Sequence, residues 1–395
     1  MKKSLLALAA LGAFAGAAHA QSSVTLYGII DQGVNLVTNV KTATGSAHLY
    51  NMSSGVMQGS RWGLRGAEDL GGGLKAVFVL ENGFDLGSGA LGQGGLLFGR
   101  QAYVGLSSSQ FGSVTLGRQY DSVVDYIGPL IAADQWSGYI GAKPGDVDNF
   151  NNAFRTNNAI KFTSVNYAGL TFGGMYSLGG QAGNFTGNQT WSLGGSYANG
   201  PLSLAAGYLN ARTPSNAGAL MGNNTSTSTP GAIKTPVYSG FVNANTYQVI
   251  GAAGAYTFGA ATFGVNYSNV SFRNLGANGA TIFERGTNAT FNNVEANFKY
   301  QITPAWLAGV AFDYVDRGSV AKANGTEAGN AKYYQYQLGT DYFLSKRTDL
   351  YVIAIYQHAS GTDSTGGRAV AAINNLTASS GPNQFTARVG IRHKF

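Results

Sequence analysis

The chain has 395 residues, including 58 glycines and no cysteine, and a net charge of +7 from 25 Lys and Arg against 18 Asp and Glu. Charged residues make up only 11% and aromatic residues 12%, which excludes an intrinsically disordered chain. The basic residues are scattered singly, so the net charge does not indicate nucleic-acid binding.

The first twenty residues have the pattern of a secretion signal. Lys2 and Lys3 precede an apolar stretch at 5–18, and Ala18 and Ala20 form a small-x-small cleavage pattern. This stretch is shorter than the roughly 20 apolar residues that a membrane-spanning helix needs. We therefore predict a cleaved Sec signal peptide at 1–20 and a mature domain at 21–395.

Beyond the signal, apolar and polar side chains alternate in many segments. The alternation is clearest at 23–37, 292–301, 334–344 and 384–395. A period of two is typical of strands with two different faces. A closed β-barrel can cross a membrane with such strands, because it satisfies every backbone group between strands and needs apolar residues only at alternate positions.

Sixteen segments fit this strand pattern. They begin near residues 23, 57, 72, 97, 112, 154, 168, 188, 201, 244, 260, 289, 304, 332, 347 and 383. Seven tight turns alternate with eight longer polar connections, as expected when both ends of an antiparallel barrel lie on the short-turn side. We predict an all-β protein, a transmembrane barrel of sixteen antiparallel strands. A soluble β-solenoid or sandwich is the alternative, but the chain has no fixed repeat of the kind that solenoids show.

Several segments resemble the general diffusion porins of Gram-negative bacteria, of the β-proteobacterial type. They are SVTLYG (23–28), SRWGLRGAEDLGGGLK (60–75), GRQAYVGL (99–106), FGSVTLGRQY (111–120) and GIRHKF (390–395). The resemblance implies a homotrimer in the cell outer membrane, with short periplasmic turns, long extracellular loops and a third loop folded into each pore. It also implies that Phe395 ends the strand recognised by the barrel-assembly machinery. Outer-membrane lipid, including lipopolysaccharide, and small hydrophilic solutes and ions are the other expected partners.

The connection from 118 to 155 is the expected inward loop. Loops longer than about 15 residues in a compact fold are usually functional or disordered. This one is mostly acidic, with Lys143 as its one lysine and Asp148 among its acids. We expect four of its aspartates at a pore constriction: Asp121, Asp125, Asp134 and Asp146. The alternative is a solvated extracellular loop.

Bases on the barrel wall are expected to face this loop. Arg61, Arg100 and Arg155 alternate with apolar neighbours and therefore point to the lumen, since an arginine facing lipid would cost about 2–4 kcal/mol at mid-bilayer. These three positions also match a basic row in the family that the chain resembles. Further candidates for the wall are Arg118, Lys161 and Lys299.

Opposed acids and bases across a narrow pore create a transverse field, and the sign of the excess charge sets the ion preference. We therefore predict a general diffusion pore with a modest preference for anions. Two other functions stay open. A substrate-specific channel would line its lumen with aromatic residues, for which Tyr27, Tyr256 and Tyr333 are candidates, and an adhesin or receptor would use the exposed segment 211–239.

The sequence does not indicate an enzyme. Three histidines remain after residue 20, His48, His358 and His393, and none has the spacing of metal ligands. A G-x-S-x-G nucleophile motif and a cysteine nucleophile are both absent from the sequence. We expect no catalytic residue, no metal and no cofactor.

Overall fold

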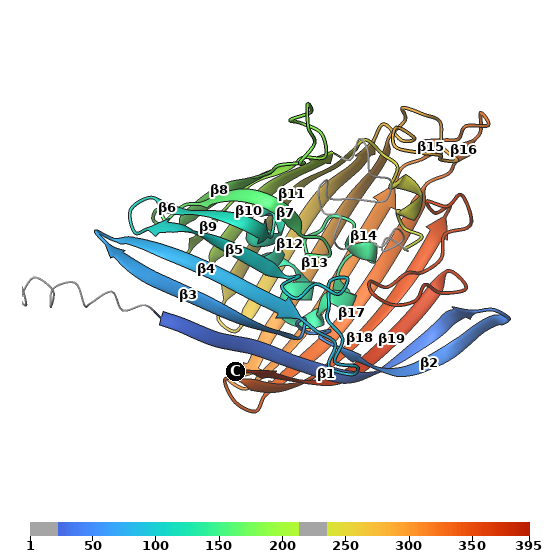
Figure 1. The fold of residues 1–395 in the computed structure, drawn as a ribbon. Coiled ribbons are helices and arrows are strands. Elements are labelled where there is room, and N and C mark those ends of the chain that lie inside the picture. Colours follow the sequence, from blue (N-terminus) through green and yellow to red (C-terminus); the bar gives the residue numbers. More distant parts are fainter. Residues whose placement is uncertain (1–22, 213–234) are drawn as a thin grey trace, which may run out of the picture.

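The computed structural model describes residues 23–212 and 235–395 (Figure 1). The predicted signal peptide at 1–20 and most of the segment 211–239 lie outside the described residues. Among the described residues, no helix is both long and apolar enough to cross a membrane.

Most of the described chain is β-strand. The strands in chain order are β1 (Ser23–Thr42), β2 (Gly45–Ser54), β3 (Arg61–Gly71), β4 (Leu74–Gly83), β5 (Gln101–Ser108), β6 (Gly112–Gln119), β7 (Thr156–Thr163), β8 (Leu170–Ser177), β9 (Thr190–Asn199), β10 (Leu202–Arg212), β11 (Thr246–Phe258), β12 (Ala261–Arg273), β13 (Ala289–Thr303), β14 (Trp306–Arg317), β15 (Val320–Ala321), β16 (Glu327–Ala328), β17 (Ala331–Phe343), β18 (Thr348–Gly361) and β19 (Asn383–Lys394). The short β15 and β16 pair only with each other, and the other strands form one sheet.

That sheet is a closed antiparallel barrel. β1 pairs with β19 through residues 29–37, which joins the two ends of the sheet. The other edge of β1 pairs with β2 through β1 residues 32–42 and with β3 through β1 residues 23–29. β2 and β3 therefore occupy one strand position, interrupted at residues 55–60, which we call the β2–β3 break. Counted in this way the barrel has sixteen strands, and the predicted fold class is confirmed.

One predicted boundary is wrong. The second strand position begins at Gly45 in β2, whereas the sequence pattern predicted a start near residue 57 after a long polar connection. β1 and β2 instead form a hairpin with a two-residue turn, which extends away from the barrel wall in Figure 1. Both faces of its outer part are exposed, so its sequence has no reason to alternate.

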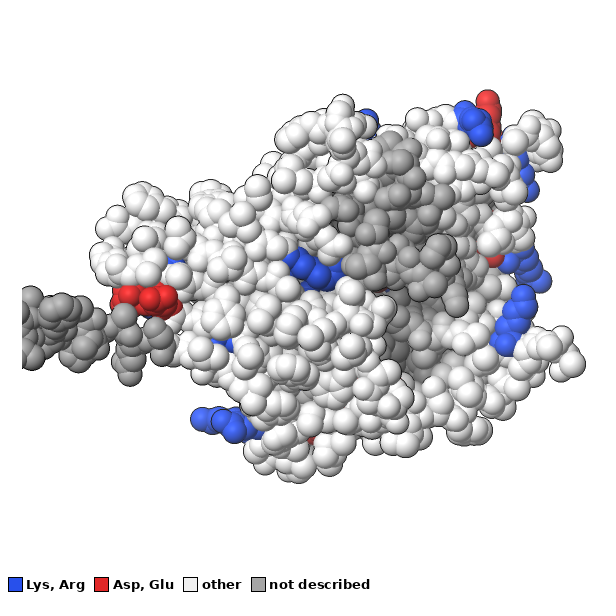
Figure 2. Space-filling model, viewed as in Figure 1, with Lys and Arg blue, Asp and Glu red and all other residues white. Residues whose placement is uncertain are grey.

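The alternating faces of the strands have opposite surroundings. On β5–β7 the exposed apolar side chains are Val104, Leu106, Val114, Leu116, Ile160 and Phe162. Figure 2 shows charged residues at a few scattered positions, while most of the visible surface is formed by other residues. An outer face of this kind suits contact with lipid, and the polar residues of the same strands face the lumen.

The connection between β6 and β7 folds into the barrel, as predicted. We call residues 120–155 the inward loop. It contains α2 (Ser122–Tyr126) and the short turns η1 (Gly128–Leu130), η2 (Ala133–Ser137), η3 (Tyr139–Gly141) and η4 (Pro144–Asp146). Along the loop, α2 contacts β8–β10, η1 contacts β11 and β12, and η2 contacts β14 and β17.

Glycines on the wall let the loop approach closely. The buried Trp136 ring lies where Cβ atoms on Gly309 and Gly339 would stand, and Phe150 does the same at Gly251. The main apolar core therefore lies between the inward loop and the β10–β17 side of the wall, and it includes Val123, Ile127, Phe150, Val249, Phe272 and Phe291. The β3–β7 side of the lumen carries the predicted basic residues except Lys299, which lies on β13.

Candidate pore constriction

Asp121 begins the inward loop as a helix cap. Its Oδ1 accepts hydrogen bonds from the backbone N–H of Val123 (2.9 Å) and of Val124 (3.3 Å), and its Oδ2 accepts one from Asn149 Nδ2 (2.7 Å). Burial raises the pKa of Asp121 to about 7. This carboxylate is fully buried and holds the shape of the loop.

Asp146 has a similar internal role near the end of the loop. It accepts hydrogen bonds from the backbone N–H of Asn151 (3.0 Å) and of Ala153 (2.8 Å). Burial, and then the nearby Asp148 carboxylate, raise the pKa of Asp146 to about 7. Two of the four predicted constriction acids are thus bonded within the loop itself.

Asp125 and Lys161 form an ion pair between the loop and β7. Lys161 Nζ also donates to the backbone oxygen of Tyr120 (3.0 Å). Burial raises the pKa of Asp125, and Lys161 opposes the rise. The structure therefore brings one predicted acid and one predicted base together, at a site that retains partial access to water.

Asp134 is the predicted acid that stays exposed. Its Oδ1 accepts a hydrogen bond from Asn151 Nδ2 (2.5 Å), and it interacts electrostatically with Arg61 and Arg100 across the lumen. The enclosing protein raises the pKa of Asp134, whereas Arg61 lowers it. Because its carboxylate reaches the lumen, Asp134 can act on a passing solute.

Four arginines gather on the opposite side of the lumen. We call Arg61, Arg100, Arg118 and Arg155 the arginine cluster. Arg61 Nε donates to Gly59 O (2.8 Å), and Arg118 Nε donates to Gly99 O (2.8 Å). Burial and the neighbouring Arg100 charge lower the pKa of Arg155 to about 10, which leaves it charged at neutral pH.

Two residues that the sequence analysis missed connect this cluster. Glu81 Oε1 lies 2.7 Å from Arg100 Nε, and Tyr120 Oη accepts from Arg100 Nη2 at 3.1 Å. The Arg155 guanidinium stands over the Tyr120 ring at 5.6 Å from its centroid. Glu81 alternates with Leu80 on β4, so strand phase alone would have placed it in the lumen. With four arginines against one glutamate, this side of the lumen is positive.

The wall beneath the inward loop has the opposite charge. Lys143 of the loop is buried. Its Nζ lies 3.0 Å from Oδ2 of Asp148, also in the loop, and donates to Oδ1 of Asn266 on β12 at 2.6 Å. Burial alone would lower the pKa of Lys143, but Asp148 and the wall carboxylates Glu295 and Asp313 raise it above its ordinary value. The lysine therefore fastens the loop to an acidic part of the wall.

Hydrogen bonds add to that attachment. Glu295 Oε1 accepts from the backbone N–H of Ala132 (2.8 Å). Gln335 Nε2 donates to Ala142 O (3.1 Å) and to Asp313 Oδ2 (2.9 Å), so it links the loop to the wall. Glu295 is therefore bonded to the loop directly and Asp313 through Gln335.

The remaining predicted residues lie away from the arginine cluster. Lys299 lies on β13 opposite Gly309, on the wall that the loop covers. Phe395 exchanges two backbone hydrogen bonds with Gly28, both 3.0 Å, and its ring fills the space of the missing Gly28 side chain. In the described part of the chain, no group of three or more His, Cys, Asp or Glu side chains is arranged to hold a metal ion.

The three candidate lumen tyrosines do not form a track. Tyr27 donates to Glu81 Oε2 (3.0 Å) at the arginine cluster, and Tyr333 is fully buried in the core under the loop. Tyr256 was placed wrongly, because it is half exposed on the outer face of β11, in phase with the exposed Ile250.

Comparisons with known proteins agree on one family. Residues 7–362 match the Gram-negative porin family. An outer membrane porin protein of Bordetella pertussis is 34% identical over 424 residues, and the match covers 100% of both chains. Outer membrane porin protein 32 of Delftia acidovorans is 38% identical over 229 residues, which covers 54% of this chain and 61% of that protein.

Solved structures show the same architecture. The anion-selective porin from Comamonas acidovorans superposes with a TM-score of 0.71 at 25% identity, over 95% of this chain and 100% of that one. The trimer form of OmpT from Vibrio cholerae has a TM-score of 0.65 at 16% identity, over 95% of this chain and 99% of that one, which shows a shared fold.

Proposed function

We propose a function for this chain from one premise: it belongs to the Gram-negative porin family. The protein is an outer membrane β-barrel. We infer that it forms a general diffusion pore, through which small hydrophilic solutes and ions pass passively between the inward loop and the arginine cluster. Anions pass somewhat more easily than cations.

The observation that carries this proposal is the unequal number of basic and acidic side chains that face the lumen. The arginine cluster is countered on its own wall by Glu81, whereas Asp121 and Asp146 are bonded inside the loop. Asp134 is the loop acid left exposed opposite Arg61 and Arg100. Excess positive charge at a constriction favours anions. The Comamonas porin, which is described as anion-selective, has the same fold and supports this sign.

A substrate-specific channel is the second candidate, and it has less support. Such a channel needs successive aromatic residues along the lumen, but Tyr256 lies outside and Tyr333 is buried. The adhesin alternative depends on the segment 211–239, most of which lies outside the described residues. The relatives are described as porins, which are channels and not enzymes.

We further propose that the protein is a homotrimer in outer-membrane lipid that includes lipopolysaccharide. Family membership supports this assembly, and one protein of the same fold is described as a trimer. The position of Phe395 at the end of β19, paired with Gly28, is compatible with a role as the terminal signal for the barrel-assembly machinery.

The proposal is tested by planar-bilayer recording of the purified protein under a KCl gradient. We expect stable conductance steps and a reversal potential that favours Cl⁻. Arg61→Ala, Arg100→Ala and Arg155→Ala should each reduce the Cl⁻ to K⁺ permeability ratio by about twofold, because each removes one lumen charge. Lys41→Ala is the matched control, since it removes an exposed charge from the hairpin outside the lumen.

Two results would contradict the proposal. A preference for K⁺ in the wild type would overturn the anion preference, and a complete lack of conductance would overturn the pore. Liposome swelling with a series of sugars separates the two channel types. Rates that fall smoothly with sugar size support general diffusion, and one strongly favoured sugar supports a specific channel.

A further inference from the structure

The β2–β3 break lies at the junction of three parts of the molecule. β2 ends its pairing with β1 at Ser54, and β3 resumes it at Arg61. Between them residues 55–60 turn inward, and the side chains of Val56 and Met57 are buried against the inward loop and β18. The contacts of this short segment therefore affect both the barrel wall and the lumen.

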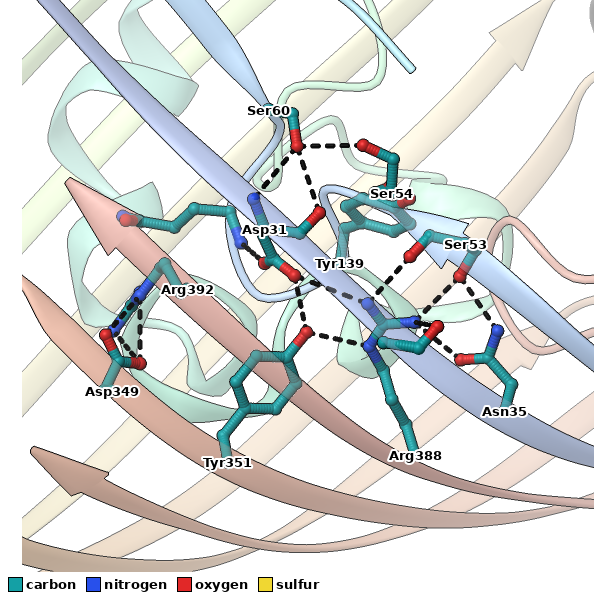
Figure 3. A network of polar contacts seen from close by, with 12 residues as sticks. Asp31, Asn35, Ser53, Ser54, Ser60, Tyr139, Asp349, Tyr351, Arg388 and Arg392 are labelled. Atoms are coloured by element: carbon teal, nitrogen blue, oxygen red, sulfur yellow. Dashed lines mark hydrogen bonds and ion pairs between the residues drawn. The ribbon is translucent and has the colours of Figure 1, made fainter. Parts of the chain in front are cut away.

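Asp31 on β1 holds the break by main-chain and side-chain contacts (Figure 3). Its backbone oxygen accepts from Gly55 N (2.8 Å) and from Ser60 Oγ (3.1 Å). Its Oδ2 accepts from Gln58 N (2.8 Å). Three of the six residues in the break are therefore bonded to one aspartate.

The charge of Asp31 is balanced at the closing edge of the barrel. Arg388 Nη2 of β19 lies 3.3 Å from Asp31 Oδ1, and Tyr351 Oη of β18 donates to the same oxygen at 2.6 Å. Arg388 Nη1 also donates to Asn35 Oδ1 (2.7 Å) and to Ser53 Oγ (2.8 Å). Both charged side chains are fully buried, so each depends on the other for compensation.

The inward loop rests on the other side of the break. Tyr139 N donates to Val56 O (2.9 Å), and Tyr139 Oη donates to Ser54 O (3.1 Å). The preceding Gly138 has a φ of +63°, and a Cβ atom there would collide with Val56 O. The backbone of the loop can approach the break this closely because residue 138 is glycine.

The far end of the break touches the arginine cluster. Arg61 Nε donates to Gly59 O (2.8 Å), and a Cβ atom on Gly59 would lie 2.9 Å from Arg100 Nη1. The position of Gly59 therefore affects two of the side chains that face Asp134. A shift of the break would move these arginines and the tip of the loop together.

We propose that Asp31 is a positioning residue for the constriction, because it fixes the β2–β3 break that seats both the tip of the inward loop and the arginines Arg61 and Arg100. The inference rests on the proposed diffusion function, since the property that Asp31 sets is the width and charge of that pore. Asp31 acts on Arg61 and Arg100 through residues 55–60.

A second buried ion pair on β19 provides a matched control. Arg392 Nη2 lies 2.9 Å from Asp349 Oδ2 and 3.2 Å from Asp341 Oδ2, with all three side chains largely buried. These contacts join β17, β18 and β19, and none of them involves residues 55–60. Figure 3 shows the Arg392–Asp349 pair beside the contacts of Asp31. Asp31→Asn and Asp349→Asn therefore make the same chemical change in the same region of the barrel.

The experiment compares single-channel recordings of the wild type, Asp31→Asn and Asp349→Asn in KCl. We expect Asp31→Asn to change the conductance and the Cl⁻ to K⁺ permeability ratio by about twofold and to increase open-channel noise, because a loosened constriction samples several widths. Asp349→Asn should keep the conductance and noise of the wild type. Both variants should lose their resistance to SDS at a lower temperature, since both weaken a buried ion pair.

A second pair of variants keeps the inference testable if Asp31→Asn does not fold. Gly138→Ala disturbs the contact between the inward loop and the β2–β3 break from the loop side. Gly89→Ala is its control, because Gly89 also has a positive φ (+74°) but has open space around it. Gly138→Ala alone should increase open-channel noise. Recordings of Asp31→Asn or Gly138→Ala that match their controls would overturn the inference. A wild type that does not conduct would instead overturn the proposed function.

Discussion

The two sides of the lumen differ in what covers them. On the β3–β7 side the wall carries the arginine cluster with Glu81, and these side chains pack closely against one another. On the β8–β18 side the inward loop covers the wall, and the acids Glu295 and Asp313 lie beneath it. Bases thus face the pore, whereas acids of the wall face the loop.

This difference shows that the total charge on the inner wall of the barrel is not the charge that a passing solute meets. A buried carboxylate needs partners because burial of an unpaired charge costs several kcal/mol. Glu295 and Asp313 find those partners in the loop and in neighbouring amide groups, and a solute does not meet them. The ion preference then depends on the charged groups that face the pore.

Strand length follows part of the same division. β5, β6 and β7 have 8 residues each, whereas β13 has 15 and β18 has 14; β8, at the border of the covered side, also has 8. At about 3.3 Å per residue, β13 and β18 are longer along the strand by roughly 20 Å. These long strands provide inner surface against which the loop packs.

The largest expected effect comes from breaking the attachment on the covered side. Lys143→Met leaves Asp148 as an uncompensated buried charge, which should destabilise the docked loop by about 3–5 kcal/mol. We expect rapid protease cleavage within residues 120–155 while the barrel stays folded. Cleavage sites mapped by mass spectrometry check this result.

The Asp125–Lys161 pair on the β3–β7 side is expected to contribute less to loop stability than the Lys143–Asp148 pair. Lys161→Met removes the partner of Asp125, but both side chains of this pair keep partial contact with water. The loss should therefore be below about 1 kcal/mol, and cleavage of the loop should stay close to that of the wild type. Equal cleavage of the two variants would show that the two sides do not differ as described.

An intermediate effect is expected from pH. The pKa of Asp134 is raised by the enclosing protein, so its carboxylate gains a proton as the pH falls from 8 to 5, while the arginines stay charged. Loss of this negative charge should increase the Cl⁻ to K⁺ permeability ratio by up to about twofold. Reversal potentials at pH 8, 6.5 and 5 measure the change.

Asp134→Asn isolates the contribution of that carboxylate. The variant should have, at every pH, the Cl⁻ to K⁺ permeability ratio that the wild type reaches at pH 5, so the ratio should not change with pH. Asp125→Asn is a useful companion, since burial also raises the pKa of Asp125 but Lys161 already pairs with it. An anion preference that falls on acidification would contradict the assignment of Asp134 to the open pore.

The smallest effect is expected at Lys299. This lysine belongs to the covered wall, opposite Gly309, at a distance from the arginine cluster. Lys299→Gln should change the permeability ratio by only about a tenth, because a charge outside the constriction is screened by the electrolyte. A change as large as that of Arg100→Ala would place Lys299 at the constriction after all.

Much of the barrel could be predicted because its strands have two unlike faces. The alternation in β13 and β19 identified both strands, and the same phase placed Arg61 and Arg100 in the lumen. β2 was missed because its outer part is exposed on both faces, so that neither face selects apolar residues. A strand can be recognised in the sequence only where its two faces differ in burial.

The roles of the loop aspartates were harder to predict. Charge and sequence position do not separate Asp134, which faces the lumen, from Asp146, which bonds to the loop backbone. For Asp121 a signal was present, because an aspartate followed directly by a short helical segment is a typical N-cap. The acids of the covered wall depend on tertiary contacts with residues more than a hundred positions away.

The pairing of β1 with β19 also determines when the barrel can form. Asp31 and Arg388 are 357 positions apart, so this contact and the whole β1–β19 ladder require almost the full chain. Closing so long a loop costs more conformational entropy than any hairpin of the sheet, and contacts between distant residues make folding slow. Until β19 arrives, β1 keeps an unpaired edge that could join another chain. Protection of that edge during export is therefore a kinetic requirement of this fold.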